Sequence, residues 1–391
     1  MNVVFISPNF PPQYLLFCEA LRSRGHRVLG IGDSRWEDLH PDLRASLAEY
    51  FYVPRLEHYP DMLRALGYLT WKHGKIDRLD SLNEHWLPVE ARLREDFNVP
   101  GLRPAQTDRL RRKSGMAEIF LAAGIPAPAL EKVTGADQVR SFVSRVGLPV
   151  VFKPDVGMGA VGAFKVSTRE QLEAALAMPL EGLVVQGFSP GRITTYDGLT
   201  DATGDVVFES SLVYGAGIME STTEGLDVAY WTRRDLPPAL VELGRRTVTA
   251  FGLRERFFHI EFFELPDGGY RALEVNLRPP GGFTTDMMNW SCDTDVYQLW
   301  AATLGGGVLE GFAYEHRYFC AHLARRKQKR YRLSHDELVR ALGPGLLVYR
   351  ELPPPISAAM GDFIYMVRYA ELADLQEAVR LVGDGSRTTT D

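Results

Sequence analysis

One stretch of the sequence constrains the fold more than any other: FFHIEFFELPDGGYRALEVNLRPPGG. Within it, residues 266–269 (PDGG) predict a tight turn between two runs that alternate as β-strands. A hairpin closed symmetrically about this turn pairs Leu265 with Tyr270, and the same register places Glu261 opposite Glu274. The sequence therefore predicts two carboxylates that face one another across neighbouring strands.

Asn276 and Arg278 fall on the same face of the second strand as Glu274, because side chains alternate along a strand. Two carboxylates placed directly opposite repel each other unless something positive lies between them. With an amide oxygen they form a hard ligand set that suits Mg²⁺, or Mn²⁺, alongside waters and phosphates. We therefore predict a metal site at Glu261, Glu274 and Asn276. A solvated acidic hairpin is the alternative, and a one-residue slip in register would separate the two faces. His259 would lie opposite Asn276 and fits a structural histidine better than a metal ligand.

A second motif, VVFKPDVGMGAVGAFKVS, carries Gly157, Gly159 and Gly162 in the spacing GxGxxG. A strand pattern lies on each side of this loop and a helical pattern (169–177) comes only later, so the loop does not open a helix as a dinucleotide-binding loop must. It predicts a flap whose backbone N–H groups approach phosphate oxygens, while Lys153 supplies a positive charge from the preceding strand. A mobile hairpin with a surface lysine stays open as the alternative.

The other segments predict elements of an α/β protein. An apolar run at residues 2–7 predicts a buried strand, a helical pattern follows at 14–24, and HRVLGIGD predicts a second strand. This order implies a parallel, three-layer α/β domain. The first turn (8–12, PNFPP) has no glycine that would let the backbone approach a pyrophosphate, which argues against a hydride-transfer enzyme. Residues 107–123 predict one amphipathic helix, ended by Gly124.

Composition and charge exclude several classes of protein. The 391 residues carry a formal net charge of -6, so no positive field attracts nucleic acid or an anionic membrane. The three cysteines, Cys18, Cys292 and Cys320, are scattered and lack CxxC spacing, which argues against a disulfide framework or a zinc site. The sequence starts without a signal-peptide pattern and has no apolar run long enough to span a bilayer. We expect a cytoplasmic protein of two or three domains.

In this order the motifs resemble the ATP-grasp superfamily, and E-V-N-L-R-P after an acidic strand is the most specific part of the match. The resemblance implies an α/β and α+β protein, in which a Rossmann-like pre-ATP-grasp domain is followed by the ATP-grasp fold and a C-terminal extension. The expected divisions are a pre-ATP-grasp α/β domain (1–105), a small lid subdomain with the phosphate flap (106–185), a metal-binding subdomain (186–305) and a C-terminal α+β segment (306–391).

The resemblance also implies roles for single residues. Lys113 would contact the α-phosphate of ATP, and Lys153 would be the second phosphate-binding lysine. Arg278 would lie near the transferred phosphoryl group or the acyl substrate, which makes Lys153 and Arg278 the expected catalytic residues. Gln186 stands in the adenine hinge where the family usually has an acid, and Asp197 is the candidate for the ribose. The residues implied in ATP binding are Lys113, Lys153, Gly157, Met158, Gly159, Ala160, Gly162, Gln186, Gly187 and Phe188.

The implied activity is that of an ATP-dependent carboxylate–amine ligase. Such an enzyme forms an amide or peptide bond through an acyl phosphate and releases ADP and phosphate. Its partners would be a small-molecule carboxylate and an amine, with neither nucleic acid nor membrane, and the chain could form a homodimer. Two alternatives stay open: a biotin-carboxylase-like component that carboxylates its substrate, and a non-catalytic ATP-binding regulator on the same fold.

Substrate choice is expected to lie in the first domain and in the segment after Arg278. The candidate substrate residues are Asn9, Glu84, His85, Arg278, Gly281 and Gly282. The backbone N–H groups of the last two could stabilise a tetrahedral oxyanion. The basic run 325–330 predicts either a solvated face or an anchor for an acidic substrate or a carrier protein.

Overall fold

The structure, a computed structural model, describes residues 1–157, 162–215, 227–307, 310–354, 356–383 and 387–388. Met158, Gly159 and Ala160 of the predicted flap lie outside these residues. No helix of the described part is long and apolar enough to cross a membrane.

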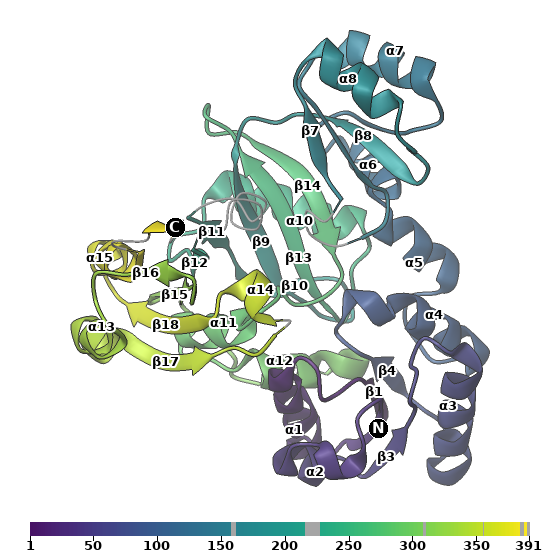
Figure 1. Cartoon of the computed structure of the whole chain (residues 1–391). Coiled ribbons are helices and arrows are strands. Elements are labelled where there is room, and N and C mark those ends of the chain that lie inside the picture. Colours follow the sequence, from purple (N-terminus) through teal and green to yellow (C-terminus); the bar gives the residue numbers. More distant parts are fainter. Residues whose placement is uncertain (158–161, 216–226, 308–309, 355, 384–386, 389–391) are drawn as a thin grey trace.

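The N-terminal part is a parallel sheet with helices on both faces, as the β-α-β pattern predicted (Figure 1). Strand β1 lies between β2 and β4, and its side chains alternate between two cores: Val3 and Phe5 pack toward one face, Val4 and Ile6 toward the other. The elements are β1 (Asn2–Ile6), α1 (Leu15–Ser23), β2 (Arg27–Gly32), α2 (Pro41–Ser46), β3 (Glu49–Tyr52), α3 (Tyr59–His73), β4 (Arg78–Asp80) and α4 (Leu87–Asp96).

A smaller unit follows, in which two helices precede a four-stranded antiparallel sheet of order β5-β8-β6-β7. The single helix predicted over residues 107–123 is wrong: the backbone of Arg112 is extended (φ -89°, ψ 130°) and divides it into α5 and α6. The elements are α5 (Pro104–Arg111), α6 (Lys113–Ala122), β5 (Leu130–Lys132), α7 (Ala136–Val146), β6 (Val150–Pro154), β7 (Phe164–Val166), α8 (Arg169–Leu176) and β8 (Leu183–Gly187).

The rest of the chain is built on one nine-stranded sheet of order β14-β13-β9-β11-β12-β15-β18-β17, with β10 beside β9. Its strands are β9 (Arg192–Thr200), β10 (Val206–Ser210), β11 (Leu212–Tyr214), β12 (Ala229–Thr232), β13 (Phe257–Glu264), β14 (Tyr270–Asn276), β15 (Phe319–Arg325), β17 (Leu346–Glu351) and β18 (Phe363–Tyr369). The helices are α10 (Pro238–Ala250), α11 (Thr284–Cys292), α12 (Val296–Thr303), α13 (His335–Leu342), α14 (Ile356–Met360) and α15 (Leu372–Gly383), and β16 (Lys329–Arg330) pairs with β19 (Arg387–Thr388). The C-terminal strands thus continue the sheet that carries the acidic hairpin (Figure 1).

The β13–β14 hairpin has the predicted register where it matters for the site. Glu261 pairs with Glu274 and His259 pairs with Asn276. Nearer the turn the predicted pairing of Leu265 with Tyr270 is wrong, because a β-bulge shifts the register by one residue and Tyr270 pairs with Glu264 instead. The symmetric turn was the wrong assumption, and the bulge restores the expected register at the two acids.

Candidate functional site

Two acidic side chains face each other at the centre of the candidate site. Glu274 is buried, and Lys113 Nζ lies 3.7 Å from its Oε2. Burial raises the pKa of Glu274; Lys113 lowers it and the charge of Glu261 raises it. Burial also raises the pKa of Glu261, but His259, Arg278 and Lys153 lower it more, so the pKa of this carboxyl lies below its usual value. The pair is therefore asymmetric, and Glu261 is the carboxyl held in its ionised form.

A buried histidine supports Glu261 from the same strand. His259 Nδ1 lies 2.7 Å from Asp197 Oδ1, and its Nε2 lies 3.4 Å from Glu261 Oε1. Burial alone would lower the pKa of His259, but Asp197 and then Glu261 raise it to about 9. His259 is thus a satisfied histidine between two carboxylates, as its position opposite Asn276 suggested.

Asp197 does not fit the ribose role that the sequence suggested. Its side chain is fully buried, accepts a hydrogen bond from the Thr195 hydroxyl and pairs with His259. The ribose candidate is therefore wrong, because both carboxylate oxygens are used inside the protein. The local pattern of β9 gave no sign that this acid would pair with His259 on the neighbouring strand β13.

Both predicted phosphate lysines are buried and converge on the acidic pair. Lys113 is the first residue of α6, and its Nζ donates a hydrogen bond to the Gly157 carbonyl oxygen at 2.8 Å. Lys153 lies on β6. Burial lowers the pKa of Lys153 to about 8, with Glu274 opposing this shift and Lys113 adding to it. Two ammonium groups and two carboxylates therefore share one partly dehydrated space.

The donor set fits a magnesium ion that has other ligands besides protein. Within the described residues, no three His, Cys, Asp or Glu side chains form a ready metal cluster. Two facing carboxylates and the Asn276 amide are present, and Asn276 Nδ2 contacts the His259 carbonyl oxygen at 3.5 Å, which leaves its Oδ1 for a ligand. Mg²⁺ commonly takes one or two carboxylates and completes its octahedron with phosphates and waters.

Arg278 lies beside this pair at the end of β14. Its Nη1 donates to the Pro279 carbonyl oxygen at 2.7 Å, and its charge lowers the pKa of Glu261. Two tyrosines that the sequence analysis missed also lie near it: burial raises the pKa of Tyr14 and of Tyr214, and Arg278 opposes both shifts. Neither tyrosine carries a motif, so only the packing of distant segments reveals them.

Gly282 is a junction of three parts of the chain. Gln13 Nε2 donates to its carbonyl oxygen from the N-terminal part. A Cβ on Gly282 would lie 2.4 Å from Met360 Cε and 2.9 Å from the Tyr230 hydroxyl oxygen, and its φ is +67°, so glycine is strongly favoured. Gly281 faces open space, because a Cβ added at this residue would meet nothing within 4 Å.

The predicted substrate residues of the first domain have other contacts. Glu84 is buried; its Oε2 accepts a hydrogen bond from the Leu277 N–H at 3.1 Å, which ties it to the end of β14. Asn9 Nδ2 donates to Ser34 Oγ at 2.9 Å. His85 is exposed, with its Nε2 3.6 Å from a Glu57 carboxylate oxygen. Of the three, Glu84 is the one that bonds to the residue directly after the strand of Glu274.

In the segment predicted to bind adenine, two backbone N–H groups already have partners within the protein. Gln186 is buried in β8. The N–H of Gly187 donates to the Ala129 carbonyl oxygen at 2.9 Å, and that of Phe188 to the Pro149 carbonyl oxygen at 3.2 Å. These two donors are therefore already used within the protein.

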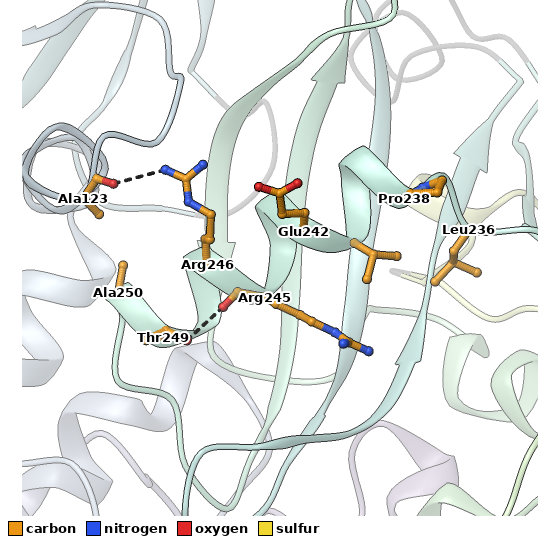
Figure 2. Close-up of a pocket in the computed structure, with 9 residues that line it drawn as sticks. Ala123, Leu236, Pro238, Glu242, Arg245, Arg246, Thr249 and Ala250 are labelled. Atoms are coloured by element: carbon orange, nitrogen blue, oxygen red, sulfur yellow. Dashed lines mark hydrogen bonds between the residues drawn. The ribbon is translucent and has the colours of Figure 1, made fainter.

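A hollow of about 850 Å³ lies elsewhere, over the outer face of α10 (Figure 2). It is lined by Leu236, Pro238, Val241 and the polar side chains of that helix, and Arg246 reaches across it to the Ala123 carbonyl oxygen at 3.4 Å. None of the predicted site residues lines it.

Comparisons with known proteins place the chain among related sequences and folds. No protein-family model matches the chain. It is similar to the carbamoyl phosphate synthase large chain of Beutenbergia cavernae (29% identity over 160 residues, 39% of this chain and 14% of that protein). It is also similar to D-alanine–D-alanine ligase of Corynebacterium aurimucosum (29% over 177 residues, 42% of this chain and 46% of that protein). The chain thus spans less than half the length of these curated relatives.

Among solved structures, the chain is similar to an L-amino acid ligase from Bacillus licheniformis. The TM-score is 0.76 at 18% identity, and the match covers 100% of this chain and 98% of that one. The likeness extends over all parts of the fold, including the C-terminal strands.

Proposed function

Because the chain has the ATP-grasp fold, we propose that it is an ATP-dependent ligase that joins a carboxylate to an amine and releases ADP and phosphate. One observation carries the proposal: the facing acids Glu261 and Glu274 meet the buried lysines Lys113 and Lys153 in one site. Such a set of charges suits a polyphosphate with its metal ion. The phosphates would pair with the lysines, and the metal ion would pair with the acids.

The two lysines would bind the phosphates. Each is buried, so in the free protein its ammonium group has lost water and faces the acids instead. Phosphate oxygens would replace that lost hydration with charge-assisted hydrogen bonds, which are stronger in a dehydrated site. Gly157, held by Lys113, would place the start of the flap beside the same phosphates.

Glu261, Glu274 and Asn276 would hold Mg²⁺, which would neutralise charge on the transferred phosphoryl group. His259 would keep Glu261 ionised and in one orientation, since ligand carboxylates depend on such outer partners. Arg278 would orient the acceptor carboxylate next to this centre.

The proposed reaction has two steps. An oxygen of the acceptor carboxylate attacks the γ-phosphorus of ATP while the bond from phosphorus to the ADP oxygen breaks, which gives an acyl phosphate. The amine then attacks the acyl carbon and gives up a proton, the carbon–oxygen bond to the phosphoryl group breaks, and phosphate leaves. Positioning and charge neutralisation are the protein's main contributions to such transfers.

The substrates themselves are small molecules of carboxylate and amine class. We further propose that they bind between the N-terminal part and the loop after Arg278, where Gln13 and Met360 meet Gly282. The divisions 1–105, 106–185, 186–305 and 306–391 and a possible homodimer stay predictions.

The proposal is tested by incubating the protein with Mg·ATP and panels of amino acids and small acids, singly and in pairs. ADP release that requires both an acid and an amine, with the amide identified by mass spectrometry, is the expected result. Glu274→Gln is the matched inactive control. Release of AMP and pyrophosphate would contradict the acyl phosphate route, and ADP formed with bicarbonate alone would favour a carboxylase.

A further inference from the structure

Asp155 is a buried acid that lies two residues after Lys153, between β6 and the glycine loop. Its Oδ1 accepts a hydrogen bond from the Ser114 N–H at 2.8 Å, and its Oδ2 accepts one from Ser114 Oγ at 3.0 Å. Two more distant cations, Arg112 Nη1 at 3.6 Å and Lys132 Nζ at 3.9 Å, also face Oδ2. One carboxylate thus gathers four groups, three of them from the start of α6 or the residue before it.

The backbone of Asp155 makes the same connection a second time. Its carbonyl oxygen accepts a hydrogen bond from the Lys113 N–H at 2.8 Å, and its own N–H donates to the Gly182 carbonyl oxygen at 2.9 Å. Lys113 and Ser114 are the first two residues of α6, whose N–H groups have no partner within the helix. Asp155 therefore caps α6 from a different part of the chain and places a negative charge at its N-terminus.

This cap holds the two phosphate lysines relative to one another. Lys113 is bound to Asp155 through its backbone N–H, while Lys153 lies on β6, two residues before Asp155. Lys113 then returns through Nζ to the Gly157 carbonyl oxygen, two residues after Asp155. These contacts close a ring through Lys113, Asp155 and the first residue of the glycine loop, and Lys153 lies on β6 two residues before that ring.

The helix has little freedom to shift within this ring. A Cβ on Gly115 would lie 2.2 Å from the Arg109 carbonyl oxygen, so the first turn of α6 lies directly on the end of α5. The extended backbone at Arg112, which divides the predicted helix, brings Lys113 and Ser114 to Asp155. The break between α5 and α6 is thus the feature that permits the cap.

Resting on the proposed nucleotide-binding function, we propose that Asp155 is a positioning residue that sets the distance and orientation of Lys113 and Lys153 for binding polyphosphate. It acts through the two lysines and does not itself touch the nucleotide. Binding of a phosphate chain costs less conformational entropy when both lysine side chains are already held in position than when binding must order them.

The experiment compares Asp155→Ala and Asp155→Asn with Asp137→Asn, which removes a fully exposed acid of the same unit. The affinity for Mg·ADP is measured by calorimetry well below each variant's melting temperature. Asp155→Ala should weaken binding about tenfold or more, the usual effect of losing a charge-assisted hydrogen bond. Asp155→Asn keeps an acceptor for the Ser114 N–H but removes the charge, so it should recover part of the affinity, and Asp137→Asn should bind as wild type does.

A double-mutant cycle separates positioning from a general effect on folding. If Asp155 acts through the lysines, Asp155→Ala should weaken binding far less in a Lys113→Ala background than in wild type. Equal effects in both backgrounds, or Asp155→Ala binding Mg·ADP within twofold of wild type, would overturn the proposal. Wild type that binds Mg·ADP but forms no product overturns the ligase function alone, and wild type that binds no nucleotide overturns both.

Discussion

Glu261 lies directly opposite Glu274 on the paired strands β13 and β14, and each has a different cation beside it. His259 Nε2 is 3.4 Å from Glu261, and Lys113 Nζ is 3.7 Å from Glu274. The two acids therefore differ in how readily each gives up its charge, which sets what each substitution should do.

Glu274→Gln should leave the metal-free protein as stable as wild type or more so, because burial and Glu261 already raise the pKa of Glu274. Wild type should gain melting temperature with Mg·ADP, since a ligand at a hundredfold excess over Kd adds about 2.7 kcal/mol. The variant should lose activity and most of that gain. Differential scanning fluorimetry with and without a chelator measures both, and the exposed acid Glu242→Gln is the control. A strongly destabilised variant that keeps the full shift would mark Glu274 as structural.

Lys153→Ala and Arg278→Ala should impair different steps, namely nucleotide binding and turnover. Loss of Lys153 removes a charge from the nucleotide site, so affinity for Mg·ADP and turnover should both fall. Loss of Arg278 should reduce kcat much more than nucleotide affinity, because its proposed partner is the acceptor. Steady-state kinetics together with calorimetric Kd values distinguish the two, and equal losses of affinity would show that Arg278 is misassigned.

Nucleotide affinity should fall as the pH rises through about 8. Burial lowers the pKa of Lys153 from 10.5 to about 8, so the folded protein loses this proton while the unfolded chain keeps it. Below pH 8 the buried ammonium charge of Lys153 therefore lowers the free energy of unfolding. This destabilisation decreases as the pH rises from about 8 toward 10.5. Calorimetry above pH 8 should show proton uptake on binding Mg·ADP. In Lys153→Arg the pH step should vanish, and a flat profile in wild type would contradict the assignment.

Asp197→Asn should weaken the metal site without touching it. The substitution keeps the shape of the buried side chain but removes the charge that raises the pKa of His259. His259 would then support Glu261 less firmly, and loss of such an outer partner commonly costs 10–100-fold in metal affinity. Titration of Mg²⁺ at fixed ADP measures the effect, with Thr247→Ala as a control at a buried hydroxyl of α10. Unchanged Mg²⁺ dependence would limit Asp197 to packing.

Gly282→Ala and Gly281→Ala form a matched pair. A methyl group on Gly282 meets Met360 and Tyr230 and adds a strained φ, whereas one on Gly281 meets nothing. Gly282→Ala should raise the KM of the acceptor and lower the free energy of unfolding by about 1–2 kcal/mol, the cost of a left-handed non-glycine residue. Met360→Ala should recover part of both losses, and Gly281→Ala should keep wild-type stability. Absence of rescue would show that Met360 is not the obstacle.

The sequence predicts those parts of the site that depend on residues close together in the chain, and it misses those that depend on distant contacts. A hairpin closed about residues 266–269 placed Glu261 opposite Glu274, and this pairing is present because a β-bulge offsets the different pairing next to the turn. The break at Arg112 was missed, because residues 107–123 have a continuous helical pattern and only the distant Asp155 makes an extended residue favourable. Contacts between segments far apart in the chain carry no local pattern.

Gln13, Met360 and Tyr214 were missed for that reason. Each reaches the site from an element whose own residues show no motif. Asp197 was instead given a role that it does not have. Its place in the sequence suggested a ribose ligand, whereas its side chain is bound to His259 inside the protein.

The continuous nine-stranded sheet has a consequence for how this protein can be divided. Strand β12 is hydrogen-bonded to β15, so a fragment that stops at residue 305, where the expected metal-binding subdomain ends, leaves β12 as an open edge. Its unpaired N–H and C=O groups would recruit other chains, and buried side chains such as Tyr230 would lose their cover. We therefore expect the C-terminal strands to be required for this sheet to stay unaggregated, and truncation there should yield aggregates rather than a smaller folded protein.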